Sequence, residues 1–196
     1  MSISKVLVAT DFSEQAELAI KHALSVCRHT GAEMVLMHAM SISNADFSTP
    51  YPIATPVLYP EQLSDIQKDC RDRLQKERED IAGQGVEVSQ VFVDDMPEPG
   101  IQRVAKDSEV DLIVVGTHGR KGLARFLVGS VAQRVAARAT CDVLVARNDP
   151  PQGSYKGLLV PTDFSECSDR ALERALQLDA GTLPRTRRRS TGDSSD

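Results

Sequence analysis

Residues 112–131 read LIVVGTHGRKGLARFLVGSV, and this stretch contains the pattern that decides the fold. Four apolar residues of strand length, Leu112–Val115, lead directly into Gly116. A second glycine, Gly129, precedes Ser130 and a segment with helical spacing. A buried strand, a glycine-rich loop and a helix in this order are typical of one unit of a parallel α/β sheet. The loop is then expected at the carboxyl edge of the sheet, where such folds bind ligands.

The same alternation of strand and helix extends on both sides of this stretch. Apolar runs indicate five strands, and three- and four-residue spacing of apolar positions indicates helices between them. The predicted strands are 6–9, 34–38, 86–93, 112–115 and 141–146. Helices are expected from Asp11 or Ser13 to Gly31, over 63–81, from Pro99-Gly100 onward and from Ser130, with a long loop over 41–60. The apolar face of the charged helix over 63–81 consists of Leu63, Ile66, Cys70, Leu74 and Ile81. The fold class is therefore α/β, a Rossmann-like five-stranded parallel sheet with helices on both faces.

A sequence repeat divides the chain. Residues 159–166, LVPTDFSE, restate residues 7–14, LVATDFSE, at a constant offset of 152 residues. We expect a first domain over 1–147, a linker over 148–155 rich in Pro and Gly, and a truncated second copy over 156–180 with a first strand and helix only. The last segment, 181–196, contains an arginine run followed by polar residues and is expected to be a disordered tail.

Composition excludes several classes of function. The net charge of −5 argues against general binding to nucleic acid or to an anionic membrane. No run of about 18 apolar residues suggests a membrane span, and no secretory leader is expected, so we predict a cytoplasmic protein. The four cysteines form no C-x-x-C pair, which indicates reduced thiols with a structural role.

The glycine segment reads G-x2-G-x9-G-S, with Gly116, Gly119, Gly129 and Ser130 at its defined positions. Glycines let backbone N–H groups approach a ligand closely, and a helix start presents further free N–H groups to an anion. The segment is neither a Walker A loop nor a dinucleotide fingerprint, because it has no terminal Gly-Lys-Ser/Thr and no G-x-G-x-x-G follows the first strand. A polyphosphate is the expected ligand. The competing interpretation is that the glycines only form a tight turn and a helix start.

Other candidate residues follow the ends of the first two strands. Thr10 and Asp11 come after the first strand, and His38 and Ala39 end the second, so all four are expected at the same sheet edge as the loop. The Asp11 carboxylate could accept hydrogen bonds from ribose hydroxyls, and main-chain groups near Ala39 could bind an adenine edge. A helix cap is an alternative role for Asp11, and a structural role is the alternative for His38.

Two polar side chains in the glycine loop could contact phosphate. His118 lies between the glycines and Arg120 lies just beyond them, and both could equally face solvent. No pairing of a nucleophile with a base is evident, and there is no H-x-x-H or C-x-x-C metal pattern. Binding is therefore predicted, and strong catalysis is not.

These motifs together resemble the universal stress protein family: TDFS at 10–13, a strand ending in His38, VVGTHGR at 114–120 and GSV at 129–131. The resemblance implies the adenine nucleotide alpha-hydrolase-like version of the fold and its ATP-binding branch. It implies contacts to ATP, or to AMP or ADP, often with Mg²⁺ or Mn²⁺ held through the phosphates. The implied binding residues are Ala9, Thr10, Asp11, His38, Ala39, Gly116, His118, Gly119, Arg120, Gly129, Ser130 and Val131. Ala9 departs from the proline that is frequent there and that Pro161 supplies in the repeat.

The resemblance also implies a homodimer formed through the fifth strand, Cys141–Ala146. The expected protein is a stress-response ATP binder that hydrolyses ATP slowly or not at all. Two alternatives remain open: a dimeric interaction module that binds no nucleotide, and a true ATPase.

Overall fold

The computed structural model describes residues 3–40, 60–117, 128–150 and 158–178. They contain five strands, β1 (Lys5–Ala9), β2 (Glu33–Ala39), β3 (Val88–Val93), β4 (Leu112–Gly116) and β5 (Asp142–Ala146). Five helices accompany them: α1 (Glu14–Thr30), α2 (Pro60–Ala82), α3 (Pro97–Asp107), α4 (Ser130–Arg138) and α5 (Glu166–Leu178). Contacts divide the chain into residues 1–150 and 151–196.

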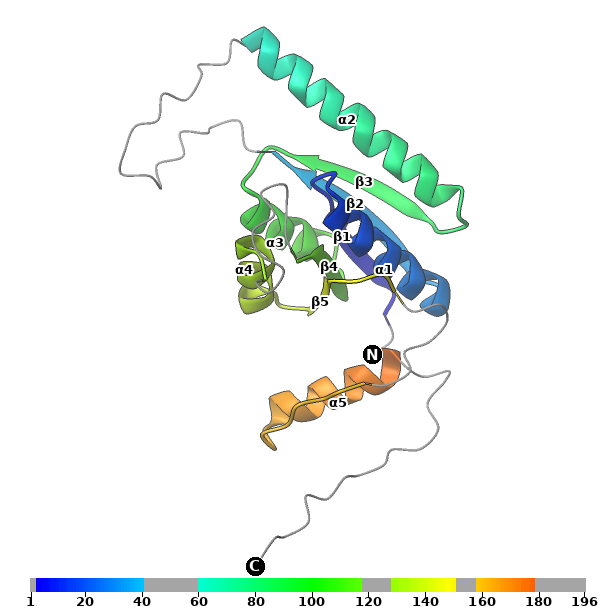
Figure 1. Ribbon diagram of the computed structural model, residues 1–196, viewed down its shortest axis with the longest axis vertical. Coiled ribbons are helices and arrows are strands. Elements are labelled where there is room, and N and C mark those ends of the chain that lie inside the picture. Colours follow the sequence, from blue (N-terminus) through cyan, green and yellow to red (C-terminus); the bar gives the residue numbers. More distant parts are fainter. Residues whose placement is uncertain (1–2, 41–59, 118–127, 151–157, 179–196) are drawn as a thin grey trace, which may run out of the picture. The chain divides into compact units, whose positions relative to one another are not determined.

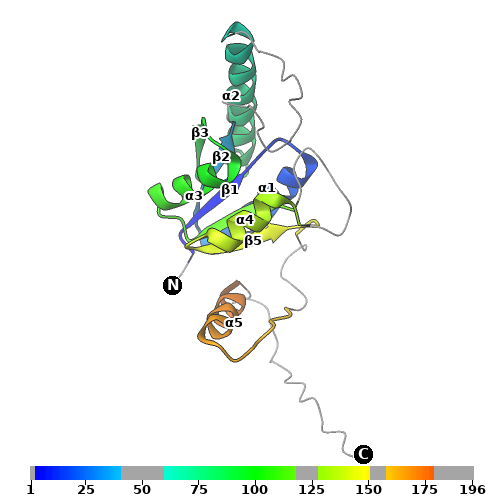
Figure 2. The same ribbon diagram turned by 90° about the vertical axis from the view of Figure 1, so that its left-hand side faces the viewer.

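The strands of the first unit form one parallel sheet in the order β3-β2-β1-β4-β5. Helices α1 and α2 lie on one side of the sheet and α3 and α4 on the other (Figure 1), and Figure 2 shows the side of α3 and α4. The fold-class prediction is confirmed. All five strands end at the same edge, because parallel strands joined by crossover helices point the same way.

The core is split by the sheet into two apolar layers. Side chains alternate along each strand, so Leu7, Met37 and Val115 pack with α3 and α4 while Val8, Leu36 and Val114 face the other side. The layer under α3 and α4 includes Ile101 and Val135, which are almost fully buried. Continuous apolar strands are typical of parallel sheets buried on both faces.

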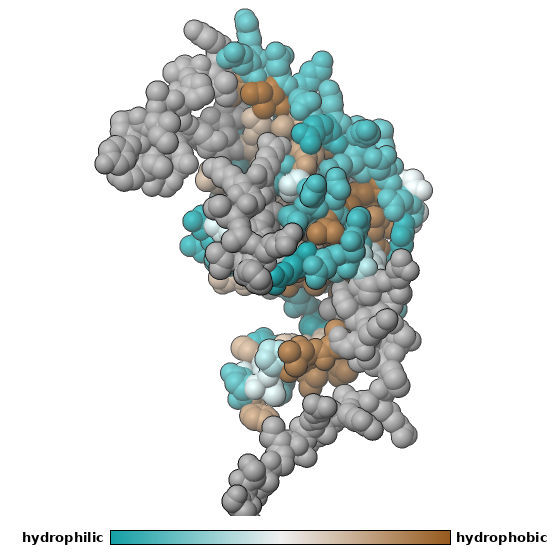
Figure 3. Space-filling view, viewed as in Figure 1, coloured by the Kyte–Doolittle hydropathy of each residue, from teal (hydrophilic) through white to brown (hydrophobic). Residues whose placement is uncertain are grey.

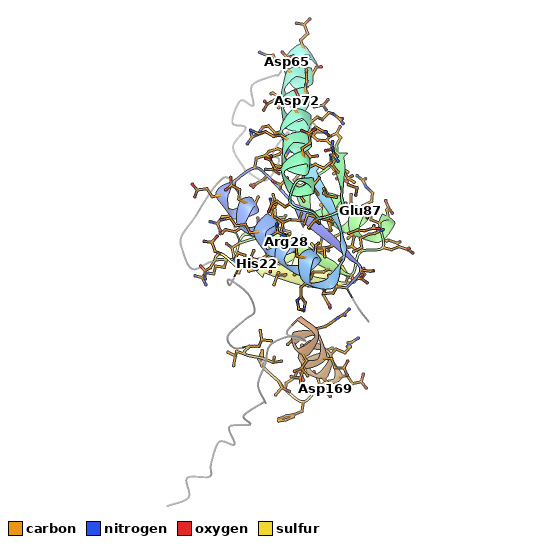
Figure 4. All side chains as sticks on the ribbon, turned by 90° about the vertical axis from the view of Figure 1, so that its right-hand side faces the viewer. His22, Arg28, Asp65, Asp72, Glu87 and Asp169 are labelled. Carbon is orange, nitrogen blue, oxygen red and sulfur yellow. The ribbon has the colours of Figure 1, made fainter. Side chains whose placement is uncertain are left out.

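Helix α1 begins and ends where its sequence indicates. Ser13 is the N-cap, and its Oγ accepts a hydrogen bond from the Ala16 N–H at 3.3 Å. Gly31 ends the helix in the left-handed conformation with φ of 75°, which costs glycine no Cβ clash. Figure 4 labels His22 and Arg28 on this helix. Burial raises the pKa of its Cys27 thiol to about 11, so this thiol is a weak nucleophile at neutral pH.

Helix α2 is strongly charged but packs one apolar face against β2 and β3. Cys70, Leu74 and Ile81 are buried, whereas Asp65 and Asp72 lie on the exposed side (Figure 4). Hydrophilic residues cover most of the visible surface of this helix in Figure 3. The sequence also assigned Ile66 to the packed face, yet its exposed fraction is 40%, because the first turns of α2 extend beyond the sheet (Figures 1 and 2).

Several element boundaries differ from the sequence prediction by a few residues. β3 begins at Val88 instead of Val86, although Val86 is buried, and β5 begins at Asp142. α3 begins at Pro97. Proline fits a first helical turn because its missing N–H would have no partner there, so the helix can start before Pro99.

The second unit is described by α5 and the turn before it. Residues 158–163 are in neither helix nor strand, so the predicted first strand of the repeat is absent there. A strand needs a paired neighbour to satisfy its backbone, which sequence similarity alone does not supply. Leu159 and Phe164 are 95% and 90% exposed, and hydrophobic residues appear at the surface of this unit in Figure 3. The predicted tail lies outside the described residues, as do the loop at 41–59 and most of the linker.

Within the described part of the chain, every helix is too short or too polar to cross a membrane.

Candidate functional site

The candidate site is a cavity at the carboxyl edge of the sheet. The chain runs from β1 to β2 on one side, while β4 is the neighbour of β1 on the other side. This is the switch point of an α/β sheet, where the loops after two adjacent strands separate and leave a crevice. Thr10 and Asp11, which follow β1, and Gly116, which ends β4, line the cavity at this point.

The walls of the cavity are mostly apolar. They come from three strands and from the helices that cover them, and the polar side chains among them are those of Thr10 and Asp11. An apolar pocket with a few polar groups at one side is typical of sites for small organic ligands. The lining residues are Ala9, Thr10, Asp11, Ala16, Met37, Ala39, Pro97, Ile101, Val115, Gly116, Val131 and Ala132.

Asp11 is held in the turn between β1 and α1. Its Oδ1 accepts hydrogen bonds from the Ser13 N–H at 3.1 Å and from the Ser13 hydroxyl. Ser13 is the N-cap of α1, so the cap role considered for Asp11 belongs to Ser13. Asp11 orients that cap and lines the cavity.

Gly116 ends β4 where the first turn of α1 comes very close. A Cβ at this position would lie 2.6 Å from the Gln15 carbonyl oxygen and 2.8 Å from its carbon. The next residue, Thr117, is buried and bonds the Gln15 side chain at 3.2 Å. Only glycine therefore fits the end of β4, and the reason is the approach of a second backbone.

Helix α4 begins beside the end of β4, because the Gly129 N–H donates a hydrogen bond to the Thr117 carbonyl oxygen. Gly129 is its N-cap, in an extended conformation with no side-chain cap, and the first turn contains no acidic residue. The N–H groups of Ser130, Val131 and Ala132 have no acceptor within the helix, since the first intrahelical bond runs from Gln133 to Gly129. Such a helix start attracts an anion. Val131 and Ala132 also line the cavity.

His38 lies on the opposite face of β2 from Met37 and Ala39. Its ring is buried, its Nδ1 donates a hydrogen bond to the Thr10 carbonyl oxygen at 2.7 Å, and it packs against Phe12 and Phe92. The structure therefore places this histidine behind the cavity wall, in a structural position.

The structure brings together most of the residues predicted from the sequence. Six of them line the cavity: Ala9, Thr10, Asp11, Ala39, Gly116 and Val131. Gly129 and Ser130 begin α4, whereas His118, Gly119 and Arg120 lie outside the described residues. Sequence reasoning missed the wall from α3, Pro97 and Ile101. The two-residue alternation of β2 could have indicated Met37, because it shares a face with Ala39.

Glu77 of α2 approaches the same turn from the other side of the sheet. Burial is the main influence and raises the pKa of its carboxyl above 4.5, and the nearby Glu17 and Asp11 add to this. A hydrogen bond from the Thr10 side chain and the charge of Arg73 oppose it. Its Oε2 is buried with no hydrogen-bond partner in the part of the chain that the structure describes.

We expect Glu77→Gln to stabilise the protein at neutral and alkaline pH. The folded state holds the Glu77 proton more tightly than the unfolded chain, so the unfolding free energy falls as the pH rises from 4.5 through the folded-state pKa. Glutamine does not ionise and avoids this loss. Thermal melts between about pH 4 and pH 8 should show an advantage of the variant that grows with pH. Glu61→Gln, at an exposed position of α2, is the control, and an advantage for Glu77→Gln that is constant with pH would contradict the prediction.

Comparisons with known proteins agree on one family. The model of the Universal stress protein family matches residues 2–147. The universal stress protein MJ0577 of Methanocaldococcus jannaschii is 32% identical over 155 residues, which cover 73% of this chain and 94% of that protein. The universal stress protein YxiE of Bacillus subtilis is 30% identical over 149 residues, covering 74% and 99%.

Solved structures share the fold. The structure of MJ0577 superimposes with a TM-score of 0.64 and 25% identity, covering 77% of this chain and all of that one. The universal stress protein of Archaeoglobus fulgidus, solved in complex with dAMP, has a TM-score of 0.52 and 20% identity, covering 74% and 99%.

Proposed function

This chain belongs to the universal stress protein family, and on that premise we propose that it binds ATP in the cavity between β1 and β4. The observation that carries the proposal is the combination of an apolar cavity, a carboxylate at its mouth and an uncapped helix N-terminus beside it. An adenine nucleotide has a flat apolar ring, ribose hydroxyl donors and anionic phosphates, and these three parts match the three features.

In this proposal, adenine lies against Met37, Ala39 and Ile101, and the Asp11 carboxylate accepts hydrogen bonds from the ribose. The phosphates lie toward the N–H groups of Ser130 and Val131, with Gly116 at the near end of the glycine loop. His118, Gly119 and Arg120 are proposed phosphate contacts on the basis of the sequence motif. Mg²⁺ or Mn²⁺ would be held through the phosphates, where it would neutralise part of their charge.

We propose binding with slow hydrolysis or none, in the cytoplasm, as a stress-response protein. All four cysteines are unpaired, which suits a reducing compartment. Occupancy of the cavity would bias a surface of the protein that a partner recognises. The runner-up is a dimeric interaction module without a nucleotide.

We also propose a homodimer through β5. This strand is at the edge of the sheet and pairs only with β4 along its described length, so its outer backbone groups can pair with a second copy. Sedimentation velocity at micromolar concentration tests this assembly, and a monomer would exclude it.

ATP is expected to stabilise the protein, and Asp11→Ala to weaken that effect. At an ATP concentration of 100 times Kd, the unfolding free energy should rise by about 2.7 kcal/mol, because only the folded state binds. Loss of a hydrogen bond to a charged acceptor should raise Kd by about tenfold or more in the variant. Thermal melts with and without ATP, and chromatography of nucleotides released by denaturation, are the measurements.

Asp163→Ala is the matched control for this substitution. Asp163 occupies the same turn in the second unit, where it accepts a hydrogen bond from the Ser165 N–H at 3.0 Å. The control loses the local bonds and leaves the cavity intact. No released nucleotide together with no thermal shift in the unsubstituted protein would overturn the proposal and favour the interaction module.

A further inference from the structure

A row of stacked side chains lies directly behind the turn that presents Asp11. The His38 ring lies between Phe12, at a centroid distance of 4.5 Å, and Phe92, at 5.8 Å. The guanidinium of Arg73 lies 4.3 Å from the Phe12 ring, and that of Arg71 lies 4.2 Å from the Phe92 ring. These five side chains, in the order Arg73, Phe12, His38, Phe92 and Arg71, are called the His38 stack below.

The His38 stack joins the turn after β1 to two strands of the sheet and to one helix. Phe12 belongs to the turn after β1, His38 and Phe92 belong to β2 and β3, and the two arginines belong to α2. Stacked rings and cations over ring faces attract each other. His38 adds its hydrogen bond to the Thr10 carbonyl, and Glu77 of α2 bonds the Thr10 side chain. The turn is therefore held on the side away from the cavity through both its main chain and its side chains.

The backbone of the turn is unusual at the residue that enters the stack. Phe12 has a φ of 62°, in the left-handed region that a bulky residue rarely adopts. Its N–H donates to the Thr10 Oγ1 at 3.0 Å. This conformation turns the Phe12 ring toward His38 while Asp11, one residue earlier, lines the cavity on the front.

The second unit contains the same turn without a stack. Phe164 has a φ of 64°, and its N–H donates to the Thr162 Oγ1 at 3.0 Å, as Phe12 does to Thr10. Phe164 is nevertheless 90% exposed. Local hydrogen bonds are therefore sufficient to form the turn. What the His38 stack adds in the first unit is the placement of the turn on the sheet.

We propose that Phe12 and His38 are positioning residues that orient the Asp11 carboxylate so that it can accept a hydrogen bond from the ribose. Helix α2 holds both residues in place through Arg73 and Arg71. This inference rests on the proposed binding of ATP. It assigns the ribose selectivity of the site to side chains that do not line the cavity. When the stack is lost, the turn still forms, but its carboxylate no longer has one position relative to the cavity.

Selectivity for the ribose 2′-hydroxyl tests the inference. The affinities of ATP and 2′-deoxyATP are measured by calorimetry for the full chain and its variants. The unsubstituted protein should prefer ATP by about tenfold, as expected for one hydrogen bond to a charged acceptor. Phe12→Ala should lower the affinity for ATP by about tenfold and the affinity for 2′-deoxyATP by less than about threefold, so that the preference for ATP is lost. Phe12→Tyr keeps the ring and should restore the preference.

Two further variants keep the test independent of folding. Phe164→Ala removes the equivalent ring from the second unit and should leave both affinities unchanged. Arg73→Ala removes an exposed side chain from the end of the stack and should reduce the preference for ATP by about threefold, even if Phe12→Ala does not fold.

The outcomes separate the inference from the proposed function. If the unsubstituted protein binds no ATP, both are overturned. The inference is overturned, and ATP binding stands, if Phe12→Ala and Arg73→Ala leave the preference for ATP over 2′-deoxyATP intact. The same conclusion follows if these variants lower the affinities for both nucleotides equally.

Discussion

Gly116→Ala is expected to lower the free energy of unfolding by about 2–4 kcal/mol, because a methyl group at this position has no space. Its Cβ would lie 2.6 Å from the carbonyl oxygen of Gln15, which belongs to the first turn of α1. The contact is with backbone, so no side-chain rotation relieves it. The chain must move α1 away from β4 or distort the end of the strand. Chemical denaturation followed by circular dichroism measures the loss.

Gly83→Ala is the matched control for this prediction. The added Cβ would lie 3.4 Å from the Glu79 carbonyl oxygen, which is an ordinary contact, and the effect should remain within about 0.5 kcal/mol. Equal stability of the two variants would contradict the close approach at Gly116. A substitution at Gly116 also has a consequence for binding experiments. It changes the packing of α1, so loss of nucleotide binding in such a variant would not identify a phosphate contact.

Leu74→Ala is expected to cost about 3 kcal/mol of stability, the typical loss for a leucine removed from a core. Leu74 is fully buried although α2 is among the most charged segments of the chain. Its side chain lies in the layer between α2 and the sheet, and alanine would leave a cavity there. Denaturation midpoints of the variant and the unsubstituted protein provide the measurement.

Ile66→Ala, two turns earlier on α2, should cost less than about 1 kcal/mol, because this side chain is 40% exposed. The two substitutions together locate where α2 leaves the sheet. Similar losses for both would mean that the first turns of α2 are packed in solution, contrary to the structure.

The fold class could be predicted from local patterns because the central strands β1, β2 and β4 are short apolar runs that are buried on both faces. The predicted ends of helices and strands were less accurate where two sequence signals indicate different ends. Pro97 and Pro99 both permit a helix start, and the first turn can include both, so the structure begins the helix at the earlier one. Helical spacing assigned Ile66 and Leu74 to one packed face, but spacing contains no information on where the neighbouring strand ends.

The candidate site was predictable in part for the same reason. Ala39 and Gly116 end their strands, and Asp11 comes shortly after β1. These strands end at one edge, which places the three residues near each other in any parallel sheet of this order. The wall from α3 was missed because Ile101 resembles any core residue of an amphipathic helix. His38 was assigned to the site from its place at a strand end, and the alternation of β2 places its side chain on the other face.

The sequence by itself determined the alternation of strands and helices, the family and the form of the turn at residues 10–13. That turn recurs in the second unit, because its hydrogen bonds join residues two and three positions apart. Only the tertiary structure decided that α1 approaches Gly116 within the radius of one methyl group and that an aromatic row with two arginines lies behind Asp11. These contacts join residues of different strands and helices, and their distances depend on how whole elements pack against the sheet.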